Sequence, residues 1–334
     1  KIVIISLSPG ADAELVRAEL ARLGLWATLG RSADGAASYF SIAPFSAACD
    51  PRVVEKIRGV ASVSASASVH PKLDAQGPVV EVNGVRIGGA APVLMAGPCS
   101  VESEKQITTI AEAVAAAGGV FLRGGAFKPR TSPYAFEGHG VPALGWLRKA
   151  ADKFSLRVVT EVMGENDVAV VAEHADLLQV GSRNMQNYSL LRAIGRAKRP
   201  VLLKRAMSAT IEEWLLSAEH LLAHGCTGVV LCERGIKSFD PWTRNLLDLG
   251  AVALVANVYK IPVIVDPSHA TGRRDLVVPL AHAAIAAGAS GLCIEAHDDP
   301  GLALSDGPQA LALPALAPLA RTMTSVWNVM HGGA

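Results

Sequence analysis

The sequence predicts an α/β protein in which a small βαββαβ domain precedes a (β/α)8 TIM barrel. From residue 92 onward, short apolar runs alternate with longer stretches rich in Ala and Leu, which is the pattern of parallel β/α units. Eight such units follow one another, and this number and their total length match a (β/α)8 barrel. Before residue 70, strand-like and helix-like stretches alternate in the order βαββαβ, as in a ferredoxin-like domain.

The chain is therefore expected to have three parts. Residues 1–70 form the small domain, with strands at 2–7, 25–29, 38–43 and 60–69 and helices at 12–24 and 51–58. Residues 71–78 are typical of a linker, because Pro, Gly and polar residues replace the periodic pattern. Residues 79–334 form the barrel, which opens with a hairpin, since the pair Asn83–Gly84 suits a type I′ turn.

The eight barrel strands are expected to begin at residues 93, 120, 157, 177, 201, 229, 263 and 291. An open, doubly wound sheet is the competing arrangement for alternating strands and helices. It is disfavoured because no GxGxxG sequence follows the first strand, so the dinucleotide-binding form of that fold would lack its phosphate loop.

Composition limits the classes of function. A formal net charge of +1 gives no general attraction to nucleic acid or to an anionic membrane, so any basic site must be local. The five cysteines show no CxxC spacing, which argues against a disulfide framework and favours a reducing cytoplasm. The most apolar stretch, residues 276–294, is interrupted by Pro279 and His282, so no membrane span is expected.

Chemically reactive side chains follow almost every expected strand. The active site of a (β/α)8 barrel lies at the C-terminal ends of its strands, so these side chains should meet on one face. One set offers a thiol, an imidazole and two carboxylates: Cys99, His269, Glu295 and Asp306. This mixed donor set suits Mn, Fe, Co, Zn or Cu, whereas Mg or Ca would be expected to avoid the thiolate.

A second set consists of cations: Arg123, Lys128, Arg130, Arg183, Lys204 and Arg234. Arginine binds phosphate oxygens with two parallel hydrogen bonds, and lysine adds a point charge. The set is larger than one phosphate requires, so it predicts two anionic substrates or one large one. Arg205 and His297 also lie near strand ends, but their positions do not assign them a role.

The same residue types also have ordinary structural roles. Cys226, Cys232 and Cys293 are expected to be small core residues, because free cysteine is among the most often buried residues. Cys99 differs, since it follows a Gly-Pro pair at a strand end where other donors converge. His269 lies in the Pro-containing stretch "DPSHATG" after the seventh strand, and loops at that end of a barrel carry the chemistry.

Seven motifs, in order along the barrel, carry a resemblance to a known family. They are "AGPCS", "RGGAFKPRTSPYAFEG", "LLKR", "CERGI", "DPSHATG", "EAH" and "SDGPQAL". Together they resemble the 3-deoxy-D-arabino-heptulosonate 7-phosphate (DAHP) synthases over residues 79–330. The βαββαβ domain is similar to the ACT-type regulatory domain of the type I beta subgroup of that family.

The resemblance implies a transferase with aldolase-like chemistry. Such an enzyme condenses phosphoenolpyruvate with D-erythrose 4-phosphate and releases phosphate, the first step of the shikimate pathway toward chorismate and the aromatic amino acids. Lys128 and His269 are implied as proton carriers and Asp266 as an orienting carboxylate. One divalent ion, Mn²⁺ first and Fe²⁺, Co²⁺, Zn²⁺ or Cu²⁺ as alternatives, would be held by Cys99, His269, Glu295 and Asp306. Phosphoenolpyruvate would be bound by Arg123, Lys128, Arg183, Lys204 and Arg234, and erythrose 4-phosphate by Arg130 and Thr131.

Two alternatives stay open at this point. The 3-deoxy-D-manno-octulosonate 8-phosphate synthases share the fold and use arabinose 5-phosphate, and they resemble "KANR" where residues 128–131 read "KPRT". The absent Asn removes a polar contact to the longer sugar, which favours erythrose 4-phosphate. The other alternative is a non-catalytic amino-acid sensor, against which the complete set of metal and phosphate residues argues.

The resemblance also bears on regulation and assembly. It implies Tyr or Phe as an effector of residues 1–70, and a homotetramer in the cytoplasm. A purely structural role for the small domain stays open, because fold alone does not establish function. The sequence ends soon after the eighth unit, so any chorismate mutase is expected to be a separate partner.

Overall fold

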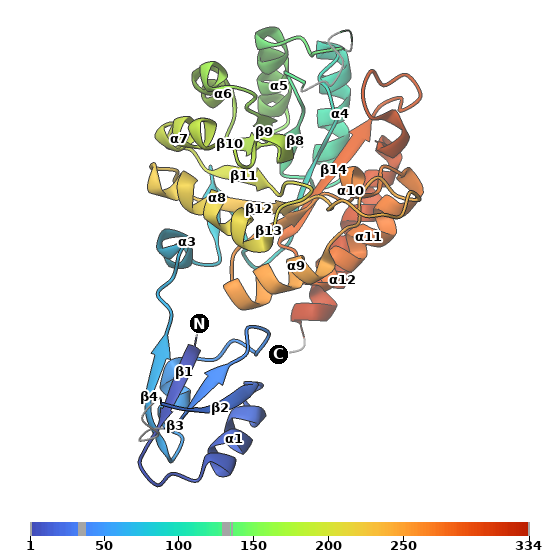
Figure 1. The fold of residues 1–334 in the computed structure, drawn as a ribbon. Coiled ribbons are helices and arrows are strands. Elements are labelled where there is room, and N and C mark those ends of the chain that lie inside the picture. The colour runs from blue at the N-terminus through green and yellow to red at the C-terminus, as the bar shows by residue number, and fades with distance from the viewer. Residues whose placement is uncertain (1, 33–37, 129–133, 135, 333–334) are drawn as a thin grey trace. The chain divides into compact units, whose positions relative to one another are not determined.

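The computed structural model describes residues 2–32, 38–128, 134 and 136–332. The chain divides into two compact units, Lys1–Val69 and His70–Ala334, and each unit has its own hydrophobic core (Figure 1). None of the described helices is both long and apolar enough to cross a membrane.

The first unit is a four-stranded antiparallel sheet with two helices. Its elements are β1 (Ile2–Leu7), α1 (Ala13–Arg22), β2 (Ala27–Arg31), β3 (Ser38–Ile42), α2 (Pro51–Val54) and β4 (Val60–Ala65). The strand order β2-β3-β1-β4 is that of a ferredoxin-like domain, which confirms the predicted fold of this part. Asp12 begins α1 by accepting hydrogen bonds from the N–H groups of Glu14 and Leu15. Helix α2 is shorter than predicted, because the chain turns after it and Gly59, with a φ of 98°, leads into β4.

The second unit is a closed barrel of eight parallel strands. They are β7 (Val93–Gly97), β8 (Phe121–Arg123), β9 (Arg157–Glu161), β10 (Leu177–Val180), β11 (Val201–Lys204), β12 (Val229–Glu233), β13 (Val263–Val265) and β14 (Gly291–His297). Strand β14 pairs with both β13 and β7, which closes the ring. The predicted (β/α)8 barrel is therefore confirmed, with all eight strands at the expected places.

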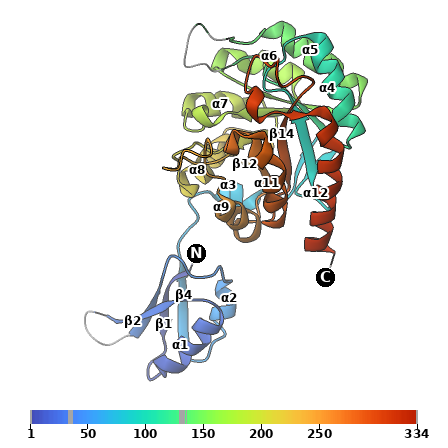
Figure 2. The same ribbon diagram turned by 90° about the vertical axis from the view of Figure 1, so that its right-hand side faces the viewer.

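Helices surround the ring of strands on the outside (Figure 1, Figure 2). The main ones are α4 (Glu104–Ala116), α5 (Val141–Lys153), α6 (Val168–His174), α7 (Tyr188–Arg196), α8 (Ile211–Ala223), α9 (Leu249–Leu254), α11 (Arg274–Ala286) and α12 (Leu316–His331). A π-helix, η3 (Val255–Tyr259), continues α9. Shorter elements lie in the connections: α10 (Pro267–Thr271), η1 (Glu165–Asp167), η2 (Ser182–Asn184), η4 (Gly307–Gln309), η5 (Leu313–Ala315) and β15 (Leu311–Ala312).

A hairpin closes the N-terminal end of the barrel. It consists of β5 (Val80–Val82) and β6 (Val85–Ile87), and both turn residues, Asn83 and Gly84, have a positive φ, as a type I′ turn requires. The buried hairpin side chains join the apolar interior of the barrel, in which Cys232 and Cys293 also lie. These two thiols are core residues, as expected. Because the N-terminal end is filled, the open end of the barrel is the C-terminal one.

Residues 71–78, expected to be a linker, pack on the barrel. Pro71–Ala75 form the helix α3, whose Leu73 is buried. The N–H groups of Lys72 and Leu73 donate to the carboxylate of Glu219 on α8, at 3.1 and 2.9 Å. The Gln76 amide forms hydrogen bonds with both the N–H and the C=O of Val229. The Pro and Gly content of this segment thus reflects a short helix and a turn against the barrel.

Candidate active site

The C-terminal ends of the strands bring together the four predicted metal-binding residues. Cys99 follows β7, His269 lies on α10 after β13, Glu295 is near the end of β14, and Asp306 begins η4. One ligand atom from each of these residues lies within 4.8 Å of the others. His269 Nε2 is 3.5 Å from Glu295 Oε2 and 3.9 Å from Asp306 Oδ2. The four donors, which are far apart in sequence, therefore form one cluster.

The thiol of Cys99 is buried and hydrogen-bonded within this cluster. Burial raises its pKa to about 11, and the nearby Glu295 carboxylate adds to the shift. Cys99 Sγ donates to Asp306 Oδ2 at 3.0 Å, while Lys128 Nζ donates to Sγ at 2.7 Å. Lys128 also donates to the Cys99 carbonyl at 3.0 Å. A metal ion bound at the cluster would favour the thiolate form of Cys99.

Asp266 orients the imidazole of His269. Its Oδ2 lies 2.8 Å from His269 Nδ1 and accepts from Lys204 Nζ at 2.6 Å, and its Oδ1 caps α10 by accepting from the His269 N–H. Burial lowers the pKa of His269 to about 3, against the opposing effect of Asp266. Burial alone would raise the pKa of Asp266, but His269 and Lys204 outweigh it and hold this pKa well below its usual value. A neutral His269 that donates from Nδ1 to Asp266 presents the lone pair of Nε2 to the cluster.

The residues of the cluster fit a divalent transition-metal ion. Glu295 is buried, and its Oε1 has no hydrogen-bond partner among the described residues. Burial raises the pKa of this carboxyl to about 7, although Arg123 opposes the shift. A buried acceptor without a partner is costly unless a cation or donor satisfies it. Thiol, imidazole and carboxylate together are the donor set of Mn, Fe, Co, Zn or Cu sites.

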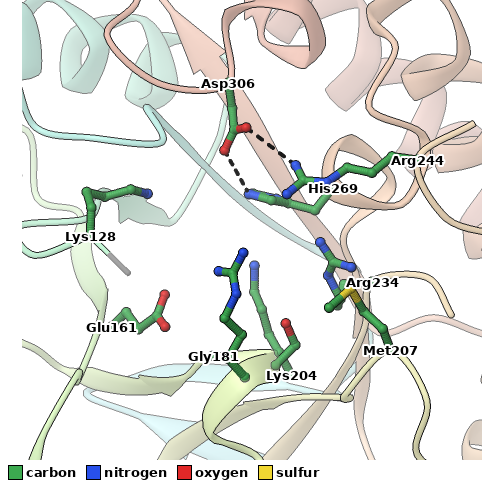
Figure 3. Close-up of a pocket in the computed structure, with 11 residues that line it drawn as sticks. Lys128, Glu161, Gly181, Lys204, Met207, Arg234, Arg244, His269 and Asp306 are labelled. Carbon is green, nitrogen blue, oxygen red and sulfur yellow. Dashed lines mark hydrogen bonds and ion pairs between the residues drawn. The ribbon is translucent and has the colours of Figure 1, made fainter. Parts of the chain in front are cut away.

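A pocket rich in cations lies beside the cluster (Figure 3). Of the predicted cations, it is lined by Lys128, Arg183, Lys204 and Arg234, and the cluster residues His269 and Asp306 form part of its wall. Arg234 is buried, and its Nη1 has no hydrogen-bond partner among the described residues. Burial lowers the pKa of this guanidinium. An unsatisfied guanidinium nitrogen in a pocket lined by further cations favours an anionic ligand.

Arg123 lies deeper in the barrel. Its Nη1 is 3.7 Å from Glu295 Oε2 and donates to the Gly97 carbonyl at 3.4 Å. It lines a small neighbouring pocket together with Cys99, Lys128 and Glu161. Lys128 and Glu161 line both pockets, so the two spaces share a wall. Arg130 and Thr131, predicted to bind the second phosphate, lie outside the described residues.

Sequence reasoning missed several residues of the site: Glu161, Gly181, Met207, Arg244 and Gln309. Glu161 ends β9 and obeys the same positional rule as the predicted residues, so this rule could have found it. Position 181 is glycine for a steric reason, because a Cβ there would lie 1.9 Å from Glu161 Oε1. Arg244 lies in a long connection after β12, where strand position gives no signal.

Arg205 and His297, to which the sequence assigned no role, belong to buried hydrogen-bonded clusters with a structural role. Arg205 Nη1 is 3.1 Å from Glu233 Oε2 and 2.9 Å from Asp248 Oδ2. His297 is buried next to Gln106, and its Nδ1 accepts from the Asp299 N–H. Neither side chain lines the cationic pocket.

The fold and this site define a (β/α)8-barrel enzyme with a cationic pocket next to a candidate metal-binding cluster. Residues 68–330 match the model of the DAHP synthetase I family. The chain belongs to this family, which confirms the resemblance seen in the motifs.

The similar proteins include deoxyheptonate aldolases and the related deoxyphosphooctonate aldolases. A phospho-2-dehydro-3-deoxyheptonate aldolase of Thermotoga maritima is 48% identical over 252 residues, which cover 75% of this chain and 75% of the relative. A 2-dehydro-3-deoxyphosphooctonate aldolase of Acidithiobacillus ferrooxidans is 32% identical over 255 residues, 71% of this chain and 90% of the relative. The crystal structure of a DAHP synthase from T. maritima superposes with a TM-score of 0.76 at 39% identity and covers 98% of both chains. A truncated form of the T. maritima synthase gives a TM-score of 0.70 at 44% identity, with 75% of this chain and 92% of that one covered.

Proposed function

We propose that this chain is a DAHP synthase, which condenses phosphoenolpyruvate with D-erythrose 4-phosphate and releases phosphate. The observation that carries the proposal is that the four-donor cluster and the cationic pocket share one wall, with Lys128 in contact with both. Two phosphorylated reactants need more cations than one phosphate does, and a carbon–carbon bond to an aldehyde needs stabilisation of the developing alkoxide. Membership in the family supports the same reaction.

Phosphoenolpyruvate is proposed to occupy the pocket of Figure 3. The Nη1 of Arg234, which has no hydrogen-bond partner in the part of the chain that the structure describes, is a donor for one of its anionic oxygens, together with Arg183 and Lys204. Arg123 and Lys128, which share the deeper pocket, are proposed to hold the rest of the molecule. We assign Arg130 and Thr131 to the phosphate of erythrose 4-phosphate on the strength of the "KPRT" motif.

A divalent ion, for which we propose Mn²⁺ with Fe²⁺, Co²⁺, Zn²⁺ or Cu²⁺ as alternatives, would supply Lewis-acid stabilisation of charge on the aldehyde oxygen. Cys99, His269, Glu295 and Asp306 would hold it. Cys99 would give up its proton on binding, and Lys128 would then face a thiolate. Asp266 keeps the Nδ1 proton on His269, so that Nε2 remains available.

The proton steps are assigned to two residues. We propose that Lys128 moves a proton at Nζ, because it stands between the cluster and the cationic pocket. His269 is the second proton carrier, oriented by Asp266, in states in which Nε2 is not a ligand. The Asp266 carboxylate also fixes Lys204 at 2.6 Å, so one acid aligns an imidazole and an ammonium group.

A substrate comparison tests the proposed reaction. With phosphoenolpyruvate and Mn²⁺ present, kcat/KM for erythrose 4-phosphate is expected to exceed that for arabinose 5-phosphate by about 10²-fold or more, because Pro129 cannot offer the polar side-chain contact that the longer sugar requires. Product formation is measured with each aldose phosphate in one assay. Preference for arabinose 5-phosphate would identify the chain as an octulosonate phosphate synthase, and no turnover of either sugar would favour a non-catalytic sensor.

The first unit is proposed to be an ACT-type regulatory domain that responds to Tyr or Phe in a homotetramer. Its ferredoxin-like strand order and its position before the barrel support this proposal. All five cysteines are free, which supports the cytoplasm as the compartment.

Removing the first unit tests this role. A chain that begins at His70 is expected to keep turnover and to lose inhibition by Tyr and Phe, measured as the concentration of each amino acid that halves the rate. The full chain is the control, and sedimentation of both forms reports whether the assembly depends on the unit. Unchanged inhibition of the shortened chain would show that residues 1–69 do not form the sensor.

A further inference from the structure

We propose that Arg244 and Gln309 are positioning residues that fix the two carboxylates of the metal-binding cluster, so that each offers one oxygen to the ion. This inference rests on the proposed metal site and adds two residues to it. Neither residue is among the four donors, and neither was assigned to a substrate.

Gln309 connects the cluster to Arg244 through its amide. The side chain is buried, with 3% of its surface exposed. Its Nε2 donates to Glu295 Oε2 at 2.8 Å, and its Oε1 accepts from Arg244 Nη1 at 3.3 Å. A glutamine amide has one donor end and one acceptor end, so a guanidinium at Oε1 keeps the NH₂ group turned toward Glu295. Arg244 thereby ensures that the NH₂ end of the Gln309 amide faces Glu295.

Arg244 also contacts Asp306 directly. Its Nη1 is 3.4 Å from Asp306 Oδ1, and Figure 3 shows the guanidinium directed at this carboxylate. The other oxygen, Oδ2, faces the cluster, where it accepts from the Cys99 thiol at 3.0 Å and lies 3.9 Å from His269 Nε2. One oxygen of Asp306 is therefore held from outside, and the other is left for the ion.

Gln309 also holds one oxygen of Glu295. Oε2, which lies 3.5 Å from His269 Nε2, accepts from Gln309 at 2.8 Å, while the buried Oε1 has no partner among the described residues. A carboxylate with one oxygen held by a hydrogen bond favours coordination through a single oxygen and loses less freedom when the ion binds. The Arg244–Gln309 pair thus acts on both acidic donors.

The backbone around Arg244 is hydrogen-bonded to α10, the helix that carries the donor His269. The N–H groups of Arg244 and Asn245 donate to the carbonyls of Thr271 and Ala270, at 2.9 and 2.8 Å. The Asn245 amide donates to the His269 carbonyl at 3.1 Å. Gly272 has a φ of 66°, and a Cβ at this position would lie 2.8 Å from the Arg244 Cβ. Three of the four donors are consequently linked to one segment of the chain.

Binding of Mn²⁺ alone to the full-length, metal-free protein tests the inference. The measurement is the dissociation constant, from the electron paramagnetic resonance signal of free Mn²⁺. Gln309→Met keeps side-chain length, and Arg244→Met keeps an unbranched apolar stem. Both remove the hydrogen bonds, and each is expected to weaken Mn²⁺ binding by about 10- to 100-fold. The double variant is expected to weaken it by less than the product of the two single effects, because Arg244 acts partly through Gln309.

Two further variants separate positioning from general structure. Arg244→Lys keeps a cationic donor and is expected to retain most of the wild-type affinity. Arg273→Met removes a neighbouring arginine that pairs only with Asp275 among the described residues, and it should bind Mn²⁺ like the wild type. If the Gln309→Met protein folds poorly, the Mn²⁺ affinity of Arg244→Met still tests the inference, because Arg244 is exposed.

The outcomes distinguish this inference from the proposed function. Wild-type protein that binds no Mn²⁺ would overturn both the metal site and the inference. Arg244→Met and Gln309→Met proteins that bind Mn²⁺ as tightly as the wild type would overturn the inference alone, and the proposed reaction would stand.

Discussion

Replacing Cys99 by Ala is expected to lower kcat for phosphoenolpyruvate and erythrose 4-phosphate by about 10³-fold or more. The thiol is the one sulfur donor of the cluster and the acceptor of the Lys128 ammonium group, so its loss affects both the ion and a proposed proton carrier. Stabilisation of a developing oxyanion by a metal amounts to several kcal/mol, and each 1.4 kcal/mol corresponds to about tenfold in rate. The measurement is kcat at saturating substrates, together with the bound Mn²⁺ per chain.

Cys49→Ala is the matched control for this experiment. Cys49 is a free thiol of the first unit and lies outside the cluster. This variant should keep both the metal content and the kcat of the wild type. Full activity of the Cys99→Ala protein in the presence of a chelator would refute the assignment of Cys99 to the metal.

Replacing Arg205 by Met is expected to lower the free energy of unfolding by about 3–5 kcal/mol, because the change leaves a buried carboxylate without its counter-charge. Arg205 is buried and bridges Glu233 and Asp248, and its Nε donates to the Ala209 carbonyl at 3.1 Å. The guanidinium also lies over the Trp214 ring, 5.8 Å from its centre. The measurement is the midpoint and slope of urea unfolding.

The loss of stability is expected to depend on pH. Burial raises the pKa of Glu233, and Arg205 opposes that shift, so the variant should have a still higher folded-state pKa. A carboxyl whose pKa is higher in the folded than in the unfolded state destabilises the protein as pH rises through the folded value. The deficit relative to the wild type should therefore be larger at about pH 8 than at about pH 5. Arg273→Met, which removes an exposed arginine, should leave the midpoint unchanged. A deficit of Arg205→Met that stays the same across this range would contradict the role given to Glu233.

The barrel could be predicted because each of its strands has a recognisable local sequence pattern. Runs such as 201–204 and 229–233 are buried and apolar up to a charged last residue, and short polar or Gly-containing stretches separate them from the helices. The same regularity predicted which side chains share one face, because parallel strands end at a common rim. Cys99, His269 and Glu295 were predicted in this way, and their donor atoms lie together with that of Asp306.

The parts that could not be predicted depend on contacts between distant segments. Residues 71–78 look like a linker by composition, and only the carboxylate of Glu219 and the backbone of Val229 make them part of the barrel. Arg244 lies well beyond the end of its strand, and its role depends on Asp306 and Gln309, more than 60 residues further along the chain. Periodicity and strand position carry no information about such pairs.

Anomalous diffraction from crystals of the full-length protein grown with Mn²⁺ and phosphoenolpyruvate tests the central claim most directly. The account predicts one strong Mn²⁺ peak within coordination distance of Cys99, His269, Glu295 and Asp306, with phosphoenolpyruvate beside it against Arg234 and Lys204. A peak elsewhere on the molecule, or phosphoenolpyruvate bound at the opposite end of the barrel, would contradict it.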